Sequence, residues 1–195
     1  MKYLKIQNNG ELDIRLVALM GGTTKTNDKY KIGKFGTGLK YTLAYLYRNN
    51  IDFKCFVGQN EVKINTIRET IGETDFEIIC INDNRTSITT QMGREWDAWM
   101  ILRELWCNAL DEGGELKEQV WDENKLTGED QKTTFYIQVT PEIQSVLDNW
   151  NNYFLHGQTP LFENETYAVY ESGRDNILKL YKQGVLIYQQ PDTKA

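Results

Sequence analysis

The feature that most constrains the fold is a helix-like segment, residues 96–111, with three polar side chains on one side and mostly apolar residues around them. Glu104, Asn108 and Asp111 follow one another at intervals of four and three residues. Because a helix has about 3.6 residues per turn, they share one stripe. The apolar neighbours predict that this helix packs against a core. Acids beside a core that are not paired with bases need a ligand, and a metal ion or a phosphate–metal complex would supply one.

Length, charge and composition favour a single cytoplasmic domain. The chain has 195 residues, of which 40% are hydrophobic, enough for one globular domain with a sizeable core. The formal net charge of −6, without a long basic run, argues against a nucleic-acid-binding surface. No apolar run reaches the roughly 20 residues of a membrane span, and the first residues do not form a signal peptide. We therefore expect one cytoplasmic domain, residues 1–195, that does not contact a membrane.

The cysteine and histidine content argues against two common kinds of site. Cys55, Cys80 and Cys107 lack the CxxC spacing of a zinc site, and the chain has one histidine. Each cysteine lies among apolar residues, so we expect reduced thiols in the core. With a single histidine, a Ser-His-Asp or Cys-His catalytic group is not expected either.

Periodicity and turn residues predict the order of the elements. Four short β-type runs between residues 52 and 90 predict an antiparallel meander, and residues 115–132 are expected to form an exposed acidic loop. Asp97 is the expected N-cap of the polar-striped helix, and Gly113 its stop. The expected strands are 3–7, 53–57, 61–65, 76–81, 85–89, 134–139, 178–181 and 185–188, and the expected helices are 13–20, 39–48, 96–111 and 141–150.

A glycine-rich segment runs directly into the helix that begins near residue 39. Gly33, Gly36 and Gly38 precede it, where backbone N–H groups and the positive end of the helix dipole can bind phosphate. Glycine suits this place because a Cβ atom would hold phosphate oxygens away from the backbone. The spacing fits neither a P-loop nor a dinucleotide fingerprint. The residues alone leave two interpretations, a phosphate site or a helix entry that needs unusual dihedral angles.

Taken together, these motifs resemble those of the GHKL ATPases, the Bergerat-fold group that includes gyrase B, MutL, the histidine kinases and the ninety-kilodalton heat-shock chaperone. Residues 33–39, Gly-Lys-Phe-Gly-Thr-Gly-Leu, resemble the second glycine box of this family, and residues 104–111 resemble its N-box. Residues 19–25 look like the start of the ATP lid of the heat-shock branch, and residues 8–10 sit where the first glycine box would fall. The resemblance spans residues 3–114.

The motifs stand in a different order from that of the family. In the family the N-box comes first, whereas here both glycine boxes precede it, which indicates a circular permutation. A permutation is physically admissible because a site needs a spatial arrangement and not a chain order. The first glycine box also carries Asn8 where the family has aspartate. The side-chain oxygen of Asn8 can still accept a hydrogen bond from the amino group of adenine.

The resemblance implies a role for each site residue. Glu104 would be the general base that activates water, and Asn108 would bind Mg²⁺ with support from Asp111. Asn8 would contact the base directly, and Thr86 would contact it through water. The residues expected to hold the nucleotide are Asn8, Gly10, Lys25, Gly33, Phe35, Gly36, Thr37, Gly38, Leu39, Lys40, Thr86, Asn108 and Asp111.

The implied fold class is α+β, a two-layer α/β sandwich of the Bergerat type in which helices cover one face of a mixed, mostly antiparallel sheet. Residues 133–195 match no part of the family and are expected to complete the sheet or to form an appendage. The implied function is Mg²⁺-dependent binding of ATP or ADP with slow ATP hydrolysis. The alternative is a non-hydrolysing or degenerate module that binds a protein partner, and a homodimer also fits. The small size and permuted order are compatible with a phage or mobile-element protein.

Overall fold

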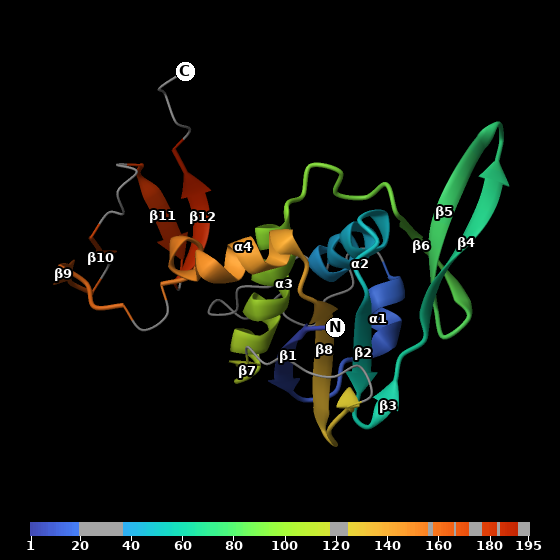
Figure 1. Cartoon of the computed structure of the whole chain (residues 1–195), viewed down its shortest axis with the longest axis horizontal. Coiled ribbons are helices and arrows are strands. Elements are labelled where there is room, and N and C mark those ends of the chain that lie inside the picture. Colours follow the sequence, from blue (N-terminus) through green and yellow to red (C-terminus); the bar gives the residue numbers. More distant parts are fainter. Residues whose placement is uncertain are drawn as a thin grey trace. The chain divides into compact units, whose positions relative to one another are not determined.

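The computed structural model describes residues 1–19, 37–117, 125–155, 158–165, 167–171, 177–182 and 184–190. Figure 1 shows the elements along the chain. Contacts divide the chain into two compact units, Met1–Gln144 and Ser145–Ala195. Length and composition predicted one domain, whose C-terminal part was expected either to complete the sheet or to form an appendage. The boundary between the units lies inside that part, residues 133–195.

The first unit is built on a five-stranded sheet whose neighbours are often distant in sequence. The strand order is β3-β2-β8-β1-β7, and all of these pairings are antiparallel. The strands are β1 (Tyr3–Asn9), β2 (Phe53–Val57), β3 (Asn60–Glu61), β7 (Glu115–Lys117) and β8 (Lys132–Gln138). Because β7 pairs with the edge of β1, the expected loop over residues 115–132 is wrong at its beginning.

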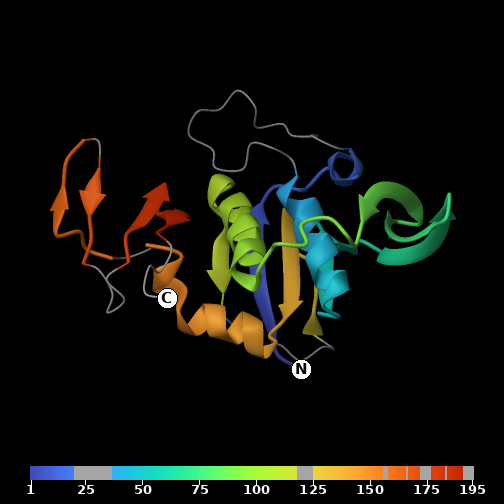
Figure 2. The same ribbon diagram turned by 90° about the horizontal axis from the view of Figure 1, so that it is seen from above.

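Two helices, α2 (Gly38–Arg48) and α3 (Ala98–Asp111), pack against each other on one face of this sheet (Figure 2). Side chains alternate between the two faces of each strand, and this alternation explains why one face of the sheet is apolar and covered. Leu4, Ile6 and Ile137 project to one face, and each is at most 2% exposed. The mixed helix and strand content and the mostly antiparallel pairing confirm the coarse fold class that the sequence predicted. None of the helices in the described ranges has the length and apolar composition needed to cross a membrane.

A separate three-stranded sheet in the first unit has the order β4-β5-β6. Its strands are β4 (Ile64–Ile71), β5 (Thr74–Ile81) and β6 (Asn84–Thr89), and β6 contacts α1 (Ile14–Ala18) and α2. The meander predicted over residues 52–90 is confirmed only in part. The pairs β2–β3, β4–β5 and β5–β6 are antiparallel, but β2 and β3 belong to the five-stranded sheet, where β2 also pairs with β8. The reason is burial: Cys55 of β2 is paired with Phe135 of β8, and both side chains are buried.

All three cysteines are free and buried, as the sequence predicted. Cys55, Cys80 and Cys107 expose 2%, 4% and 3% of their surface. Burial raises the pKa of the Cys55 thiol to about 12. Because the thiolate is the nucleophilic form, Cys55 is an inert core residue at neutral pH.

An ion-pair cluster lies at the opposite face of the five-stranded sheet. The carboxylate of Glu129 accepts hydrogen bonds from Lys5 Nζ at 2.5 Å and from Lys132 Nζ at 2.7 Å. Lys5 is 7% exposed and stands on β1, two residues from the buried Tyr3. The hydrogen bonds from Lys132, Lys5 and Gln7 lower the pKa of Glu129 from 4.5 to about 2. This cluster fastens the segment before β8 to β1.

We predict that this cluster makes the first unit sensitive to acid. A carboxylate with a lowered folded-state pKa stabilises the fold above its unfolded pKa of 4.5, and the contribution disappears as the pH falls towards 2. Because the Glu129 side chain is 43% exposed, water screens the effect to less than about 1 kcal/mol. Urea unfolding of Glu129→Gln and wild type should differ near pH 7 and converge near pH 2. A difference that is the same at both pH values would contradict the prediction. Glu61→Gln, in the exposed pair with Lys54, is the control.

The second unit consists of short elements. Trp150 stacks on Phe154 with ring centroids 4.0 Å apart, and Val185 forms a bridge with Phe154. The predicted hairpin over residues 178–188 is confirmed, since β11 and β12 pair antiparallel. The elements are η2 (Trp150–Asn152), β9 (Phe162–Glu163), β10 (Ala168–Val169), β11 (Lys179–Lys182) and β12 (Val185–Gln189), and α4 (Pro141–Asp148) leads into them.

Candidate functional site

The start of α2 and the middle of α3 meet at Gly38 and Glu104. A Cβ atom built on Gly38 would overlap the carboxylate group of Glu104. The carboxylate therefore lies directly against the backbone of the first residue of α2, where the helix dipole is positive. The structure thus brings the last glycine of the glycine-rich segment to the first acid of the polar stripe.

The polar stripe lies at the edge of the core. Glu104, Asn108 and Asp111 are each half-buried, whereas Leu105 and Ala109 are buried. Asn108 donates a hydrogen bond from Nδ2 to Oε1 of Glu104 at 3.2 Å. An amide whose nitrogen faces a carboxylate turns its oxygen to the other side. Asn108 therefore orients Glu104 and presents Oδ1 away from it.

Lys40 lies in the first turn of α2 and is 1% exposed. Its Nζ donates to the carbonyl oxygen of Leu16, in α1, at 3.4 Å. Desolvation lowers the pKa of this ammonium group. The sequence predicted that Lys40 adds charge beside a phosphate. This hydrogen bond joins α2 to α1, and the predicted role of Lys40 beside a phosphate stays a prediction.

The end of β1 meets the C-terminal end of α3. Asn8 donates from Nδ2 to the carboxylate of Glu112, and to the carbonyl oxygen of Asn9 at 3.1 Å. Gly114 packs on the same segment, because a Cβ atom there would overlap the Gln7 carbonyl oxygen and lie 2.7 Å from the Cα of Asn8. Asn8 is thereby held at the helix that carries the polar stripe, beside the residue that follows Asp111.

The structure gives Gly10 and Thr86 other partners. The N–H of Gly10 donates to the carbonyl oxygen of Gln131 at 2.8 Å, at the start of β8. Thr86 is 4% exposed, and its hydroxyl donates to the carbonyl oxygen of Ile79 at 2.6 Å within the three-stranded sheet. Neither residue contacts Glu104 through these bonds.

The remaining predicted residues belong to the glycine-rich segment. Thr37 is the N-cap residue of α2, and its side chain makes no capping hydrogen bond. Leu39 is in the first turn of the same helix. Lys25, Gly33, Phe35 and Gly36 lie outside the described residues.

The sequence did not predict the roles of Glu112 and Gly114. The signal for both is the run Asp-Glu-Gly-Gly at residues 111–114, which places a further acid after the stripe and a second glycine after the helix stop. Gly113 does end the helix, with φ +65°. Gly114 is needed for a different reason, the close approach of α3 to β1.

The side chains at this site carry oxygen donors, which suit a hard cation such as Mg²⁺. In the described ranges, no group of three or more His, Cys, Asp or Glu side chains is placed to hold a metal. The stripe instead offers carboxylate and amide oxygens from Glu104, Asn108 and Asp111. Mg²⁺ keeps several of its waters and takes one or two protein ligands beside substrate phosphates. The donor set is therefore compatible with hydrated Mg²⁺ bound together with a phosphate.

Comparison with known proteins identifies no relative. No family model matches the chain, and no curated protein or solved structure shows significant similarity to it. Any function assigned to the site therefore depends on its residues and their geometry.

Proposed function

We propose that this protein binds ATP or ADP with Mg²⁺ between α2, α3 and the end of β1, and that it hydrolyses ATP slowly. The observation that carries the proposal is the contact between the Gly38 backbone and the Glu104 carboxylate. The N-terminus of a helix is a ready anion site, because its first N–H groups have no partner within the helix. A catalytic acid beside such an N-terminus is placed next to a bound phosphate.

In this proposal Glu104 is the general base. Its carboxylate accepts a proton from the water that attacks the terminal phosphate, and such catalysis contributes about 10²–10⁴-fold. Asn108 positions the carboxylate through the 3.2 Å hydrogen bond, and its Oδ1 is the atom that we assign to Mg²⁺. Bound Mg²⁺ would neutralise charge on the phosphates. Asp111, one turn further along the stripe, would hold a water of the ion.

The glycine-rich segment provides the phosphate-binding side of the proposal. The backbone N–H groups of Gly38 and Leu39 are at the positive end of α2, and the Thr37 side chain does not cap them. On the basis of the sequence motif, we assign phosphate binding also to Gly33, Gly36 and Thr37. Only glycine at position 38 lets the backbone approach both the Glu104 carboxylate and a phosphate oxygen.

Asn8 is the residue that we assign to the base. Its Nδ2 is turned to Glu112, so its side-chain oxygen points elsewhere and can accept a hydrogen bond. Adenine carries an amino group that donates such a bond, whereas guanine carries a carbonyl oxygen at the same ring position. The proposal therefore includes a preference for adenine nucleotides.

We further propose that the first unit is a Bergerat-type domain in permuted order. Two motifs, residues 33–39 and residues 104–111, lie far apart in the chain. The last residues of the first motif, Gly38 and Leu39, begin α2, the second motif belongs to α3, and these two helices pack side by side. Such adjacency is what a permuted site requires, since chemistry depends on spatial arrangement. The antiparallel sheet beneath the two helices is also compatible with this family.

Calorimetric titration of the full chain tests the proposal most directly. We expect ATP and ADP to bind in the presence of Mg²⁺ and to bind more weakly after its removal with EDTA. GTP should bind more weakly than ATP because of Asn8. If no nucleotide binds at millimolar concentration, the proposal is wrong. Binding without any release of phosphate would favour the second function, a nucleotide-gated module that acts on a protein partner.

A further inference from the structure

The exposed apolar side chains of this protein are concentrated in the second unit, Ser145–Ala195. Among the described residues, twelve large apolar side chains are exposed, and eight of them belong to or directly flank its two hairpins. Apolar residues gathered in this way indicate an interaction surface. The eight are Leu161, Phe162, Tyr167, Val169, Leu178, Leu180, Ile187 and Tyr188.

Each hairpin exposes one apolar cross-strand pair. In the first hairpin, Phe162 of β9 is paired with Val169 of β10, and they are 51% and 46% exposed. In the second, Leu180 of β11 is paired with Tyr188 of β12, and they are 46% and 49% exposed. Cross-strand partners project from the same face of a ladder. Two-stranded hairpins are marginally stable in water, so a partner that covers these faces would stabilise them.

The two hairpins carry opposite charges. Residues 158–171 contain three acidic residues and no basic residue, and residues 177–190 contain two lysines and no acidic residue. The charged residues are Glu163, Glu165 and Glu171 in the first hairpin, and Lys179 and Lys182 in the second. A surface with one acidic half and one basic half is complementary to a rotated copy of itself.

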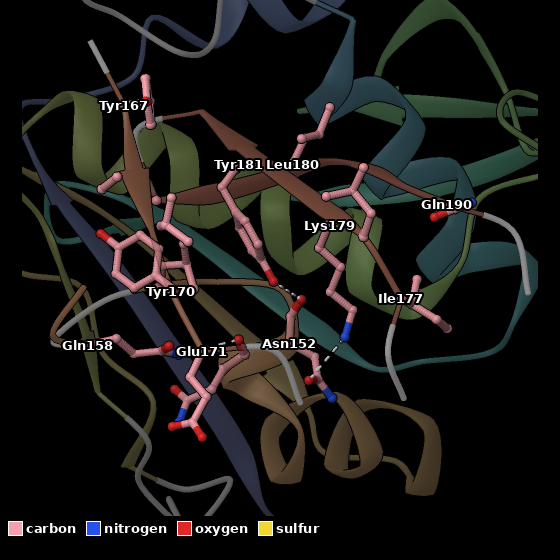
Figure 3. Close-up of a pocket in the computed structure, with 16 residues that line it drawn as sticks. Asn152, Gln158, Tyr167, Tyr170, Glu171, Ile177, Lys179, Leu180, Tyr181 and Gln190 are labelled. Carbon is pink, nitrogen blue, oxygen red and sulfur yellow. Dashed lines mark hydrogen bonds between the residues drawn. The ribbon is translucent and has the colours of Figure 1, made fainter. Parts of the chain in front are cut away.

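An open groove lies between the two hairpins (Figure 3). Val169 lines it from the first hairpin, and Leu180 and Tyr181 line it from the second. The Tyr181 hydroxyl donates to the carbonyl oxygen of Asn152 at 2.8 Å, and this bond holds the second hairpin against η2. The groove is therefore bounded by one member of each exposed apolar pair.

We propose that the second unit docks onto a second copy of this chain. In the resulting dimer, the acidic β9–β10 hairpin of one copy lies against the basic β11–β12 hairpin of the other. A two-fold axis repeats this contact, so both apolar pairs of both copies are covered at once. Docking of two acidic hairpins on each other, or of two basic hairpins, is disfavoured because like charges repel. No residue of the first unit takes part, so the inference is independent of nucleotide binding.

Two charge-reversed variants of the full chain test this proposal by sedimentation velocity. Wild type is expected to dimerise, at twice the chain mass of 22.7 kDa. Lys179→Glu/Lys182→Glu makes both hairpins acidic, and Glu163→Lys/Glu165→Lys makes both basic. Each variant alone should be monomeric because like charges then meet. An equimolar mixture should recover a dimer, since every contact in the mixed species joins an acidic hairpin to a basic one.

The mixture separates docking between copies from a contact within one copy. If the two hairpins attracted each other only inside the chain, mixing the variants would not restore a dimer. A monomeric wild type at high micromolar concentration would overturn the proposal, as would a mixture that stays monomeric. Leu180→Ser is the independent variant, because removing an exposed apolar side chain should weaken the dimer without unfolding the unit. A dimer unchanged by Leu180→Ser and by both charge variants would also overturn it.

Discussion

Replacing Glu104 by glutamine is expected to lower ATP turnover by about 10²–10⁴-fold, the typical contribution of a general base. Glutamine has nearly the volume of glutamate, so it can occupy the space beside Gly38 and accept the hydrogen bond from Asn108. It cannot accept a proton from water. Mg-ATP affinity should change by less than about threefold, because a lower kcat at constant binding is the sign of an interaction made only in the transition state.

Single-turnover phosphate release and calorimetric titration measure the two quantities separately. Glu104→Ala should also abolish turnover and leave binding largely intact. Glu61→Gln is the matched control, since Glu61 is an exposed acid of the same unit that pairs with Lys54 at 2.8 Å. Turnover of Glu104→Gln within about twofold of wild type would remove Glu104 from the role of general base.

The sequence was sufficient for the features that depend on local pattern. The helix around Glu104, its stop at Gly113 and the helix entry at Gly38 follow from periodicity and glycine placement, and the structure has all three. The resemblance of two motifs assigned Gly38 and Glu104 to one nucleotide site but did not predict the contact between them. Neither residue alone indicates that the other lies beside it.

Features that depend on long-range pairing were not predicted. The sequence has no signal that the second neighbour of β2 is β8 and not one of the strands β4–β6, because alternation fixes a face and not a partner. Two side-chain contacts were missed for a similar reason. They are the hydrogen bond from Lys40 to the Leu16 carbonyl oxygen and the contact between Asn8 and Glu112. Each joins elements whose proximity is set by the tertiary packing.

Replacing Gly38 by alanine is expected to reduce turnover almost as far as Glu104→Ala does, while the protein stays folded. The three atoms nearest to the added Cβ atom all belong to the carboxylate end of the Glu104 side chain, which can rotate away. The stability cost is small, because alanine is favoured over glycine in a helix by about 1 kcal/mol. The displaced carboxylate would then lose its hydrogen bond with Asn108. In a Glu104→Ala background, Gly38→Ala should have little further effect on turnover.

Gly114→Ala is the contrasting variant, because its Cβ atom would meet fixed backbone. It would overlap the Gln7 carbonyl oxygen and lie 2.9 Å from the Ala109 carbonyl oxygen, so β1 and α3 would have to move apart. We expect a loss of about 1–3 kcal/mol in the free energy of unfolding, measured in urea. Gly38→Ala should lose less than about 1 kcal/mol in the same assay. If Gly38→Ala unfolds the protein as readily as Gly114→Ala, or leaves turnover intact, then Gly38 does not serve the site by making room for Glu104.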